Sequence, residues 1–568
     1  MTTTSSQPAI QPRKTVQQMT AYKPPLEDRR GKIRLDFNEN TTGFPQAYQG
    51  LDSEFMTTYP EYQVFTRQLA DYFGVPEDWI LLTNGSDEGL FVIPFTFIEP
   101  GQDTTVISSP TFALIPHYLE LVQSNITAVP TLSDLSFDTE GTENALKNGA
   151  KLAIFASPDN PTGSVLPIDQ VENWCKQFPN TLFVMDEAYA GYVDQTALPL
   201  VHRYPNLMVT RSFSKVWGMA GLRLGVVVAH PKLVDAMKRV RSPYSVNALS
   251  ISIGTDLLSQ AEAVKTSAKE TMKRKADTVS RLQEMGYQIV AGHANFFLLK
   301  MGIFAKTFSQ YGFEQGVLIR DRSSMPKLEG MVRVSVGTEA EMNKFLEVLT
   351  SFRQSQVLLF DMDGTLIDTS KSFDATVAYL VDHYSGKPLE PNELDNLRAE
   401  GGFNDDWDST VELLRRRGVT KTYQDIEPLA LKTYLSLASD HESWLLDPTL
   451  LTRLGKKYTL AVATGRFRPE YDPVWKEEMD PLFTQVFCQS DVPEAKRKPA
   501  PDLLQAAMTS VNATGGIYVG NSVDDMTAAQ GAGLIPVGVT TTHDAETLKN
   551  AGAQIVLNHL SELENLLC

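Results

Sequence analysis

Short runs of β-branched or apolar residues alternate with helical patterns from about residue 50 to residue 245. The clearest runs are TTVISS, KLAIFAS, LFVMDEA and LRLGVVVAH. Strands that alternate with helices predict a mainly parallel sheet with helices on both faces. A long polar stretch at Ala261–Met285 predicts a helix, ANFFLLK and MVRVSVG predict shorter strands, and a closing helix is expected near Glu339–Phe352.

A second series of strands begins almost at once, at QVLLFDMDGTLID. Residues 372–446 have a helical, charged pattern without clear strands, and YTLAVATG, TQVFCQS, GIYVGNS and LIPVGVT then alternate with helices again. The second half therefore predicts an α/β core with a helical insertion. The first 26 residues contain no acidic residue and are rich in Ser, Thr, Gln and Pro, which indicates a disordered arm at residues 1–20.

Length and composition are typical of a globular protein with more than one domain. At 568 residues the chain exceeds what one hydrophobic core supports. The formal net charge of −18 makes nucleic acid an unfavourable partner, because phosphate backbones select basic surfaces. Three cysteines without a CxxC pair fit a reducing compartment, and the longest apolar stretch, near Phe91–Ile98, is far too short for a membrane span. We therefore expect a cytoplasmic protein that acts on small molecules.

The densest chemical signal is a lysine among hydroxyl and glycine residues, in RSFSKVWGMAGLRLG (211–225). Lys215 could form an imine there while its neighbours hold a phosphate, although a lone lysine is usually a solvated surface charge. Upstream, SPDNPTG places Asn160 after a predicted strand, and MDEAY places Asp186 at the end of another, with Tyr189 close behind. Pyridoxal chemistry requires these parts, because a carboxylate keeps the ring nitrogen protonated and polar groups tune the imine.

A second signal is the turn NGSDEG (84–89), which follows the predicted strand WILLT. Main-chain N–H groups at such a strand-to-helix turn can bind an anion, and the helix N-terminus reinforces them. Most NGSDE segments are ordinary turns, so this motif alone would be weak. Together with the lysine segment it predicts a phosphate site.

The order of these motifs resembles that of the fold-type I aminotransferases, and among them histidinol-phosphate aminotransferase. The resemblance covers about residues 20–350 and consists of FNEN (37–40), TYPEY (58–62), NGSDE, PTF (110–112), NPTG, DEAY, SFSK, GLRLG, SPYSVN (242–247), ANFFLL, IRDR (319–322) and VRVSVGT (332–338). It implies an α/β transferase fold dependent on pyridoxal 5'-phosphate, at residues 21–353, with a large domain at about 50–245 and a small domain from the flanking segments. It also implies a homodimer. Threonine-phosphate decarboxylases and aromatic aminotransferases share most of the pattern, so the substrate stays open.

The resemblance assigns a role to each cofactor residue. Lys215 would bind the cofactor as the internal aldimine, Asp186 would pair with the pyridine nitrogen, and Asn160 and Tyr189 would hold the phenolic oxygen. Phe112 would stack on the ring, where the family often has tyrosine. The cofactor phosphate would be approached by Tyr59 of the partner subunit and surrounded by the residues of the turn and the lysine segment, which are Gly85, Ser86, Asp87, Ser212, Ser214 and Arg223.

The resemblance also assigns substrate contacts. Arg333 would pair with the carboxylate of the amino donor, a task that suits a planar guanidinium. Arg320 and Tyr22 would contact a substrate phosphate, and Asn40 would be a further substrate contact. A structural ion pair is the alternative role for either arginine.

The second half opens with carboxylates at a strand end, in VLLFDMDGTLIDTS (357–370). One aspartate can attack phosphorus and the other can protonate the leaving oxygen. Because like charges so close require a cation, Mg²⁺ with its oxygen ligands is expected. An EF-hand Ca²⁺ loop is excluded, since its run of ligands is absent. Later motifs add Thr464 after YTLAVA, Lys498 in KRKPAPDLL and the acids of YVGNSVDDM (518–526).

These motifs resemble the haloacid-dehalogenase superfamily of phosphatases, in the subfamily with a helical cap, over about residues 355–560. The resemblance implies a domain at 354–568 with a Rossmann-like core and a cap at about 372–446. Asp361 would be the nucleophile and Asp363 the general acid/base, Thr464 would bind the phosphoryl group and Lys498 would balance its charge. The metal ligands would be Asp361, Asp363, Asn521 and Asp525.

One position departs from the pattern of this superfamily. Asn521 stands where an aspartate is usual, so one negative charge is lost at the metal, although Asp524 or Asp525 could compensate. We expect weaker Mg²⁺ binding than is usual. The alternative is a second domain that has lost activity and regulates the first.

A shared intermediate would explain the fusion of the two halves. The first domain would convert imidazole-acetol phosphate and glutamate into histidinol phosphate and 2-oxoglutarate. The second could hydrolyse histidinol phosphate, the next step of histidine biosynthesis. A different phosphorylated or aromatic amino acid, with another metabolite phosphatase attached, is the rival hypothesis.

Overall fold

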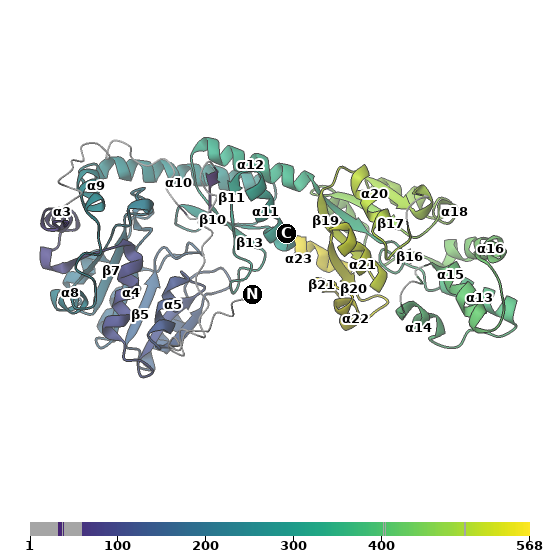
Figure 1. Ribbon diagram of the computed structural model, residues 1–568, viewed down its shortest axis with the longest axis horizontal. Helices are drawn as coiled ribbons and strands as arrows, with labels where there is room; N and C mark the ends of the chain where they lie inside the picture. The colour runs from purple at the N-terminus through teal and green to yellow at the C-terminus, as the bar shows by residue number, and fades with distance from the viewer. Residues whose placement is uncertain are drawn as a thin grey trace, which may run out of the picture. The chain divides into compact units, whose positions relative to one another are not determined.

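The computed structural model describes residues 32–36, 38, 59–400, 403, 405–492 and 496–567. The predicted arm at residues 1–20, Tyr22 and Asn40 lie outside the described residues. The chain divides into two compact units, one up to Val348 and one from Leu349 to Leu567, which are described separately (Figure 1). None of the described helices has both the length and the apolar character needed to cross a membrane.

A seven-stranded sheet forms the centre of the first unit. Its order is β2-β8-β7-β6-β5-β3-β4, and β8 runs antiparallel to both of its neighbours while the other pairings are parallel. The mainly parallel sheet that the apolar runs predicted is thereby confirmed. The strands are β2 (Ile80–Thr83), β3 (Thr104–Ser109), β4 (Asn125–Pro130), β5 (Leu152–Ala156), β6 (Leu182–Asp186), β7 (Leu207–Ser212) and β8 (Gly225–Ala229).

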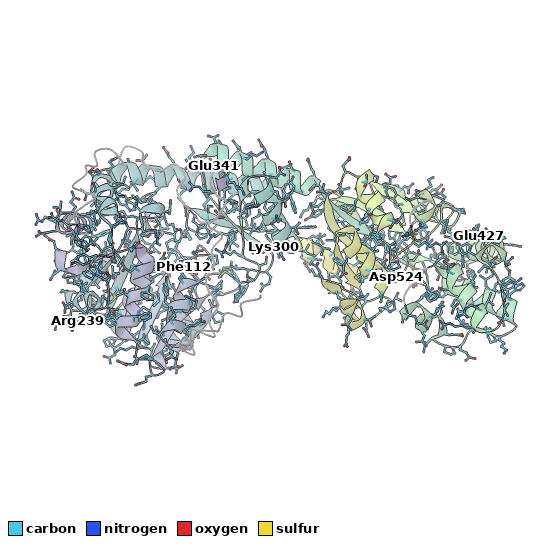
Figure 2. All side chains as sticks on the ribbon, in the orientation of Figure 1. Phe112, Arg239, Lys300, Glu341, Glu427 and Asp524 are labelled. Atoms are coloured by element: carbon cyan, nitrogen blue, oxygen red, sulfur yellow. The ribbon has the colours of Figure 1, made fainter. Side chains whose placement is uncertain are left out.

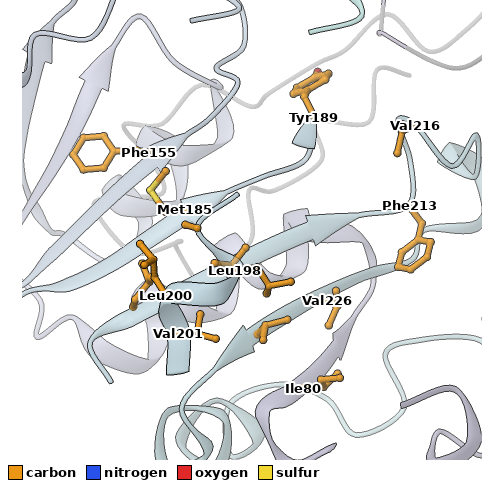
Figure 3. Close-up of a cluster of buried hydrophobic side chains, with 14 of the residues drawn as sticks. Ile80, Phe155, Met185, Tyr189, Leu198, Leu200, Val201, Phe213, Val216 and Val226 are labelled. Atoms are coloured by element: carbon orange, nitrogen blue, oxygen red, sulfur yellow. The ribbon is translucent and has the colours of Figure 1, made fainter. Parts of the chain in front are cut away.

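Side chains of this sheet alternate between two hydrophobic cores. Ala153 and Phe155 face one core, and Leu152 and Ile154 face the other, as the period of two in a strand requires. Figure 3 shows the first core around Phe155. The helices of this region are α3 (Gln63–Phe73), α4 (Gly85–Phe97), α5 (Leu114–Leu121), α6 (Thr139–Lys147), α7 (Ile168–Gln177), α8 (Pro231–Lys238), α9 (Ala248–Leu258) and α10 (Ala261–Glu284).

A smaller antiparallel sheet completes the first unit. Its order is β12-β13-β10-β9, and a separate parallel pair joins β1, near the start of the described chain, to β11. The elements are β1 (Ile33–Arg34), β9 (Ile289–Val290), β10 (Phe296–Lys300), α11 (Ala305–Glu314), β11 (Val317–Leu318), β12 (Arg320–Asp321), β13 (Met331–Ser335) and α12 (Glu339–Gln354).

The core of the second unit is a parallel sheet of order β18-β17-β14-β19-β20-β21. The carboxyl ends of β14, β17 and β19 therefore lie side by side at its centre, where ligands of such sheets bind. The elements are β14 (Gln356–Phe360), α17 (Thr449–Gly455), β17 (Thr459–Thr464), α18 (Arg468–Tyr471), α19 (Lys476–Met479), β18 (Gln485–Cys488), α20 (Asp502–Ser510), β19 (Gly515–Gly520), α21 (Val523–Ala532), β20 (Ile535–Val539), α22 (Ala545–Asn550), β21 (Ile555–Leu557) and α23 (Leu563–Leu567).

A helical cap is inserted between β14 and β17. It has its own core, in which Phe373, Trp407 and Tyr434 pack together. A two-stranded pair that the sequence pattern does not predict, β15 (Ile367–Asp368) with β16 (Ser443–Trp444), joins the two linkers at the base of the cap. The cap helices are α13 (Phe373–Ser385), α14 (Glu393–Ala399), α15 (Asp406–Arg416) and α16 (Tyr423–His441).

Candidate active sites

A buried carboxylate stands at the carboxyl end of β6. Asp186 is 4% exposed, and Thr210 on the neighbouring strand donates a hydrogen bond to its Oδ1 at 2.6 Å. Burial raises the pKa of Asp186 to about 6 against the opposing effect of the Thr210 bond, and the charge of Asp87 adds to the rise. A protonated ring nitrogen against this carboxylate would offset the cost of burial, so the residue fits the predicted partner of a pyridine.

Five residues assigned to the cofactor and substrate line one small cavity of the first unit. Nζ of Lys215 lies 5.6 Å from the ring centroid of Tyr189. Phe112 (labelled in Figure 2), Asn160 and Arg333 complete the set. A lysine amine, a phenol, an amide and an aromatic face around one space are the groups that the pyridoxal ring requires.

The cavity residues that were not predicted include Asn38 and Arg322. Asn38 donates from Nδ2 to the Tyr189 hydroxyl at 2.8 Å and belongs to the FNEN motif, in which only Asn40 was assigned. Arg320 lies directly opposite Arg333 in the β12–β13 register, and Arg322, two residues further, is the one that lines the cavity. The role of Arg320 stays a prediction.

Arg333 is 2% exposed and is fixed by neutral acceptors. Nη1 donates to Oδ1 of Asn160, and Nη2 donates to the main-chain oxygen of Asp36. Arg333 lines the same cavity as Lys215, and a guanidinium there fits the predicted contact with a substrate carboxylate.

The predicted phosphate residues gather at the start of α4, which begins at Gly85, one residue after the end of β2. Arg223 donates from Nη2 to Asp87 Oδ2 at 2.9 Å and from Nη1 to Ser214 Oγ at 3.3 Å. The three predicted serines, Ser86, Ser212 and Ser214, are buried. We call this group, Gly85–Asp87 with Ser212, Ser214 and Arg223, the phosphate cup.

Close main-chain packing forms the wall of the phosphate cup. A Cβ atom at Gly225 would lie 2.3 Å from the carbonyl carbon of Gly85 and 2.4 Å from the nitrogen of Ser86. Tyr59 lies outside this group, is 73% exposed and stacks on Tyr244 at 4.5 Å between ring centroids. Its contact with the cofactor of a partner subunit stays a prediction.

A buried lysine organises the centre of the second unit. Nζ of Lys498 donates to Oδ1 of Asp361 at 2.6 Å, to Oδ1 of Asp525 at 2.8 Å and to the Tyr518 hydroxyl at 2.9 Å. Burial alone would lower the pKa of Lys498, but the two carboxylates raise it well above its ordinary value. The two carboxylates thus favour the charged form of Lys498 beside the predicted nucleophile.

The predicted acid/base, Asp363, is paired with an arginine that sequence reasoning missed. Arg466 donates from Nε to Oδ1 of Asp363 at 2.8 Å, and Thr464 lies 3.4 Å from Oδ2. Thr464 ends β17, so the parallel sheet alone brings it beside the loop after β14.

The acidic residues after β19 divide into two roles. Oδ2 of Asp525 accepts from Ser522 N and Oγ at 3.0 and 2.7 Å in a capping box of α21, and its Oδ1 is bound to Lys498. Both oxygens of Asp525 are thus engaged. Asp524 (labelled in Figure 2) lines the same cavity as Asp361 and Asp363. Asn521 accepts at Oδ1 from Thr365 at 3.0 Å. Metal binding by Asp525 stays a prediction.

The oxygen atoms at this site are of the type that binds Mg²⁺. No three His, Cys, Asp or Glu side chains among the described residues are arranged to hold a metal ion. The Asp361 carboxylate, the Asp363 main-chain carbonyl and the Asn521 amide are nevertheless all oxygen donors at one sheet edge, the type that Mg²⁺ prefers.

A cavity of about 570 Å³ lies between this edge and the cap. Arg398, from the cap, donates to Asp374 and Asp406 at 2.7 and 2.6 Å. Arg497 pairs with Asp405, and carboxylates remain in excess. Acids lining the described part of the cavity include Asp361, Asp363, Asp368, Asp374, Asp395, Asp405, Asp406, Asp524 and Glu470, and its aromatic residues include Phe373, Phe403 and Trp407.

Comparison with known proteins assigns a family to each of the two halves. Residues 30–349, more than half of the chain, match the family model for aminotransferase class I and II. The chain belongs to this aminotransferase family. Residues 358–539 match the model for haloacid dehalogenase-like hydrolases, so a hydrolase-type domain with a parallel Rossmann-like core follows the aminotransferase.

Each of three relatives matches about three fifths of this chain. A histidinol-phosphate aminotransferase of Symbiobacterium thermophilum is 34% identical over 354 residues, which cover 59% of this chain and 97% of that protein. Histidinol-phosphate aminotransferase 1 of Nitrosococcus oceani is 32% identical, over 59% of this chain and 94% of that protein. The crystal structure of the Sinorhizobium meliloti histidinol-phosphate aminotransferase with pyridoxal-5'-phosphate has a TM-score of 0.54 at 23% identity, covers 60% of this chain and 97% of that chain, and shows the same fold.

Proposed function

We propose that this aminotransferase forms histidinol phosphate from imidazole-acetol phosphate and glutamate, and that its second domain hydrolyses the phosphate ester. The convergence of Lys215, Asn160, Tyr189 and Arg333 on one cavity carries the first part. Relatives named histidinol-phosphate aminotransferase, matched over nearly their full length, support the choice of substrate.

The residues of the first site divide the work of amino transfer. Pyridoxal phosphate, when bound, supplies an electron-withdrawing ring that stabilises negative charge at the substrate Cα. Asp186 would pair with the ring nitrogen and hold its positive charge, and Nζ of Lys215 would remove and return the proton at Cα. Arg333 binds the carboxylate of glutamate, and Arg322 places a second cation in the cavity for a phosphate.

A substrate panel tests this part. Transfer from histidinol phosphate should outrun transfer from phenylalanine, and Lys215→Ala should abolish both the reaction and the yellow absorbance of the holoenzyme. Turnover by Lys215→Ala would refute the assignment. A preference for phenylalanine would point instead to an aromatic aminotransferase.

The charge of the second cavity supports an aminated substrate for the phosphatase. On the cap side, carboxylates outnumber the guanidinium groups that pair with them. Histidinol phosphate carries a primary ammonium group, which these carboxylates attract, whereas its keto precursor lacks that group. Esters with a carboxylate on the leaving group would be repelled.

The reaction uses residues at the end of β14. An oxygen of Asp361 attacks phosphorus while Asp363 gives its proton to the leaving oxygen, and water then releases phosphate as Asp363 takes a proton back. Mg²⁺, when bound, neutralises the phosphoryl oxygens and the nearby carboxylates. Lys498 holds the Asp361 carboxylate in place.

Rates of phosphate release from matched phosphate esters test the proposed phosphatase activity of the second domain. Phosphate release from histidinol phosphate should exceed release from imidazole-acetol phosphate and from phosphoglycolate. Equal rates, or a preference for phosphoglycolate, would indicate another metabolite phosphatase. No release from any ester, with altered aminotransferase kinetics in Asp361→Asn, would indicate a regulatory domain.

We also propose a cytoplasmic homodimer. The exposed pair Tyr59 and Tyr244 supports a contact with a second subunit, and the free thiols of Cys175 and Cys488 fit a reducing compartment. Sedimentation of the wild type and Tyr59→Ala measures the dimer, and a monomeric, fully active wild type would refute it.

A further inference from the structure

The side chain of Arg466 is 1% exposed, which is rare for an arginine. The residue follows β17 by two positions, and its guanidinium reaches segments that are distant in sequence. These are the loop after β14, the start of α13 and the end of α16. A buried charge placed among three segments requires several charged or polar partners.

Those partners join the predicted acid/base to the cap. Nε and Nη2 both donate to Oδ1 of Asp363, the first at 2.8 Å. Nη1 donates to the Tyr434 hydroxyl at 2.6 Å, and Nη2 also donates to the two carboxylate oxygens of Glu442 at 3.1 Å. The ring centroid of Phe373 lies 4.9 Å from the guanidinium carbon.

Glu442 extends this network to both linkers between cap and core. It directly follows α16, and its side chain is fully buried. Ser372, on the other linker, donates to it at 2.6 Å, and Trp475 donates from Nε1. The β15–β16 pair lies between the same linkers. Arg466 is therefore held by the two chain segments on which the cap depends.

We infer that Arg466 is a positioning residue that orients Asp363 for proton transfer and ties this orientation to the cap linkers. The inference rests on the proposed phosphatase function. With two N–H groups on Oδ1, a proton on Asp363 is confined to Oδ2, the oxygen beside Thr464. The proton is thereby presented from a fixed oxygen.

The step that needs this proton is the first one. An oxygen of Asp361 bonds to phosphorus as the bond to the leaving oxygen breaks, and Oδ2 of Asp363 gives its proton to that oxygen. In the second step water attacks phosphorus, Asp363 recovers the proton, and the Asp361–phosphorus bond breaks. A well-placed general acid accelerates the reaction most when the conjugate acid of the leaving group is weak, because such a group leaves poorly without a proton.

Two aryl esters of nearly equal size test the inference. Phenyl phosphate has a leaving group that needs protonation, whereas 4-nitrophenyl phosphate has one that leaves readily. Because a placed general acid contributes about 10²–10⁴-fold, Arg466→Gln should lower kcat/KM for phenyl phosphate at least about tenfold more than for 4-nitrophenyl phosphate. Arg466→Lys keeps the charge without the two-pronged contact and should fall between. Arg468→Gln removes a nearby arginine that pairs with Asp491 and should leave the ratio unchanged.

The ratio of the two rates does not depend on how much of a preparation is folded. If Arg466→Gln leaves Glu442 unpaired and unstable, the double variant Arg466→Gln/Glu442→Gln removes both charges and should show the same change in ratio. Equal losses on both esters in all Arg466 variants would overturn the inference while leaving the phosphatase in place. A wild type that hydrolyses neither ester would refute the phosphatase itself, and the inference with it.

Discussion

A methyl group at position 225 would collide with the main chain at the start of α4. The Cβ atom of Gly225→Ala would lie 2.3 Å from the carbonyl carbon of Gly85 and 2.4 Å from the nitrogen of Ser86. Unbonded carbon atoms pack at about 3.5–4.0 Å, so β8 and the first turn of α4 must separate by about 1 Å. That turn forms the phosphate cup.

The expected magnitude follows from this displacement. Forcing an extra methyl group into packed structure costs about 1–3 kcal/mol. If this cost falls on cofactor binding, the Kd for pyridoxal phosphate rises by about 5–140-fold, since about 1.4 kcal/mol corresponds to a factor of ten. Pyridoxal, which lacks the phosphate, should bind with an unchanged Kd.

Titration of the apoenzyme with both compounds, followed by absorbance, measures the two affinities. Gly221→Ala is the matched control, because no atom lies within 4 Å of a Cβ added there. It should bind pyridoxal phosphate like the wild type. A Kd for pyridoxal phosphate within twofold of the wild type in Gly225→Ala, or equal weakening of both compounds, would refute the assignment of the phosphate cup.

Two further predictions concern the metal and a buried lysine. Asn521→Asp restores a carboxylate and should lower the Mg²⁺ concentration for half-maximal phosphatase activity by about tenfold, equivalent to about 1.4 kcal/mol. Asn512→Asp, at an exposed position, is the control. Identical Mg²⁺ titrations of the wild type and Asn521→Asp would refute this prediction. Lys275 is 3% exposed, donates to the carbonyls of Gly292 and Ala294, and has a pKa lowered by burial to about 7. Because the folded state then binds fewer protons than the unfolded state between pH 7 and about 10.4, the free energy of unfolding should rise with pH there, by up to about 1.4 kcal/mol per pH unit. Denaturant unfolding at pH 7 and 9 should show a smaller rise in Lys275→Met, and equal rises would contradict this.

The sequence pattern predicted the strands well because most of them are buried on both faces. Runs such as TTVISS and LFVMD contain consecutive buried residues, many of them β-branched or apolar, and they became β3 and β6. The antiparallel direction of β8 could not be predicted, since LRLGVVVAH has the same pattern in either direction. The pair β15–β16 was missed because two-residue strands carry no periodicity.

The structure brings together several residues of the local motifs, and their roles stay predictions. Lys215, Asn160 and Tyr189 each follow a strand closely, so neighbouring parallel strands bring them together. Arg466 was not predicted, because an arginine after a strand resembles any surface cation. Its burial arises from Tyr434 and Phe373 of the cap, packed against it over long sequence distances.

Phosphate release from histidinol phosphate by the purified chain with Mg²⁺ tests the two-step account most directly. Asp361→Asn is the control, since its side chain cannot attack phosphorus as a carboxylate does. The account predicts release by the wild type and none by the variant. Release that persists in Asp361→Asn would reject the assigned nucleophile, and no release by the wild type would contradict hydrolysis of the aminotransferase product by this chain.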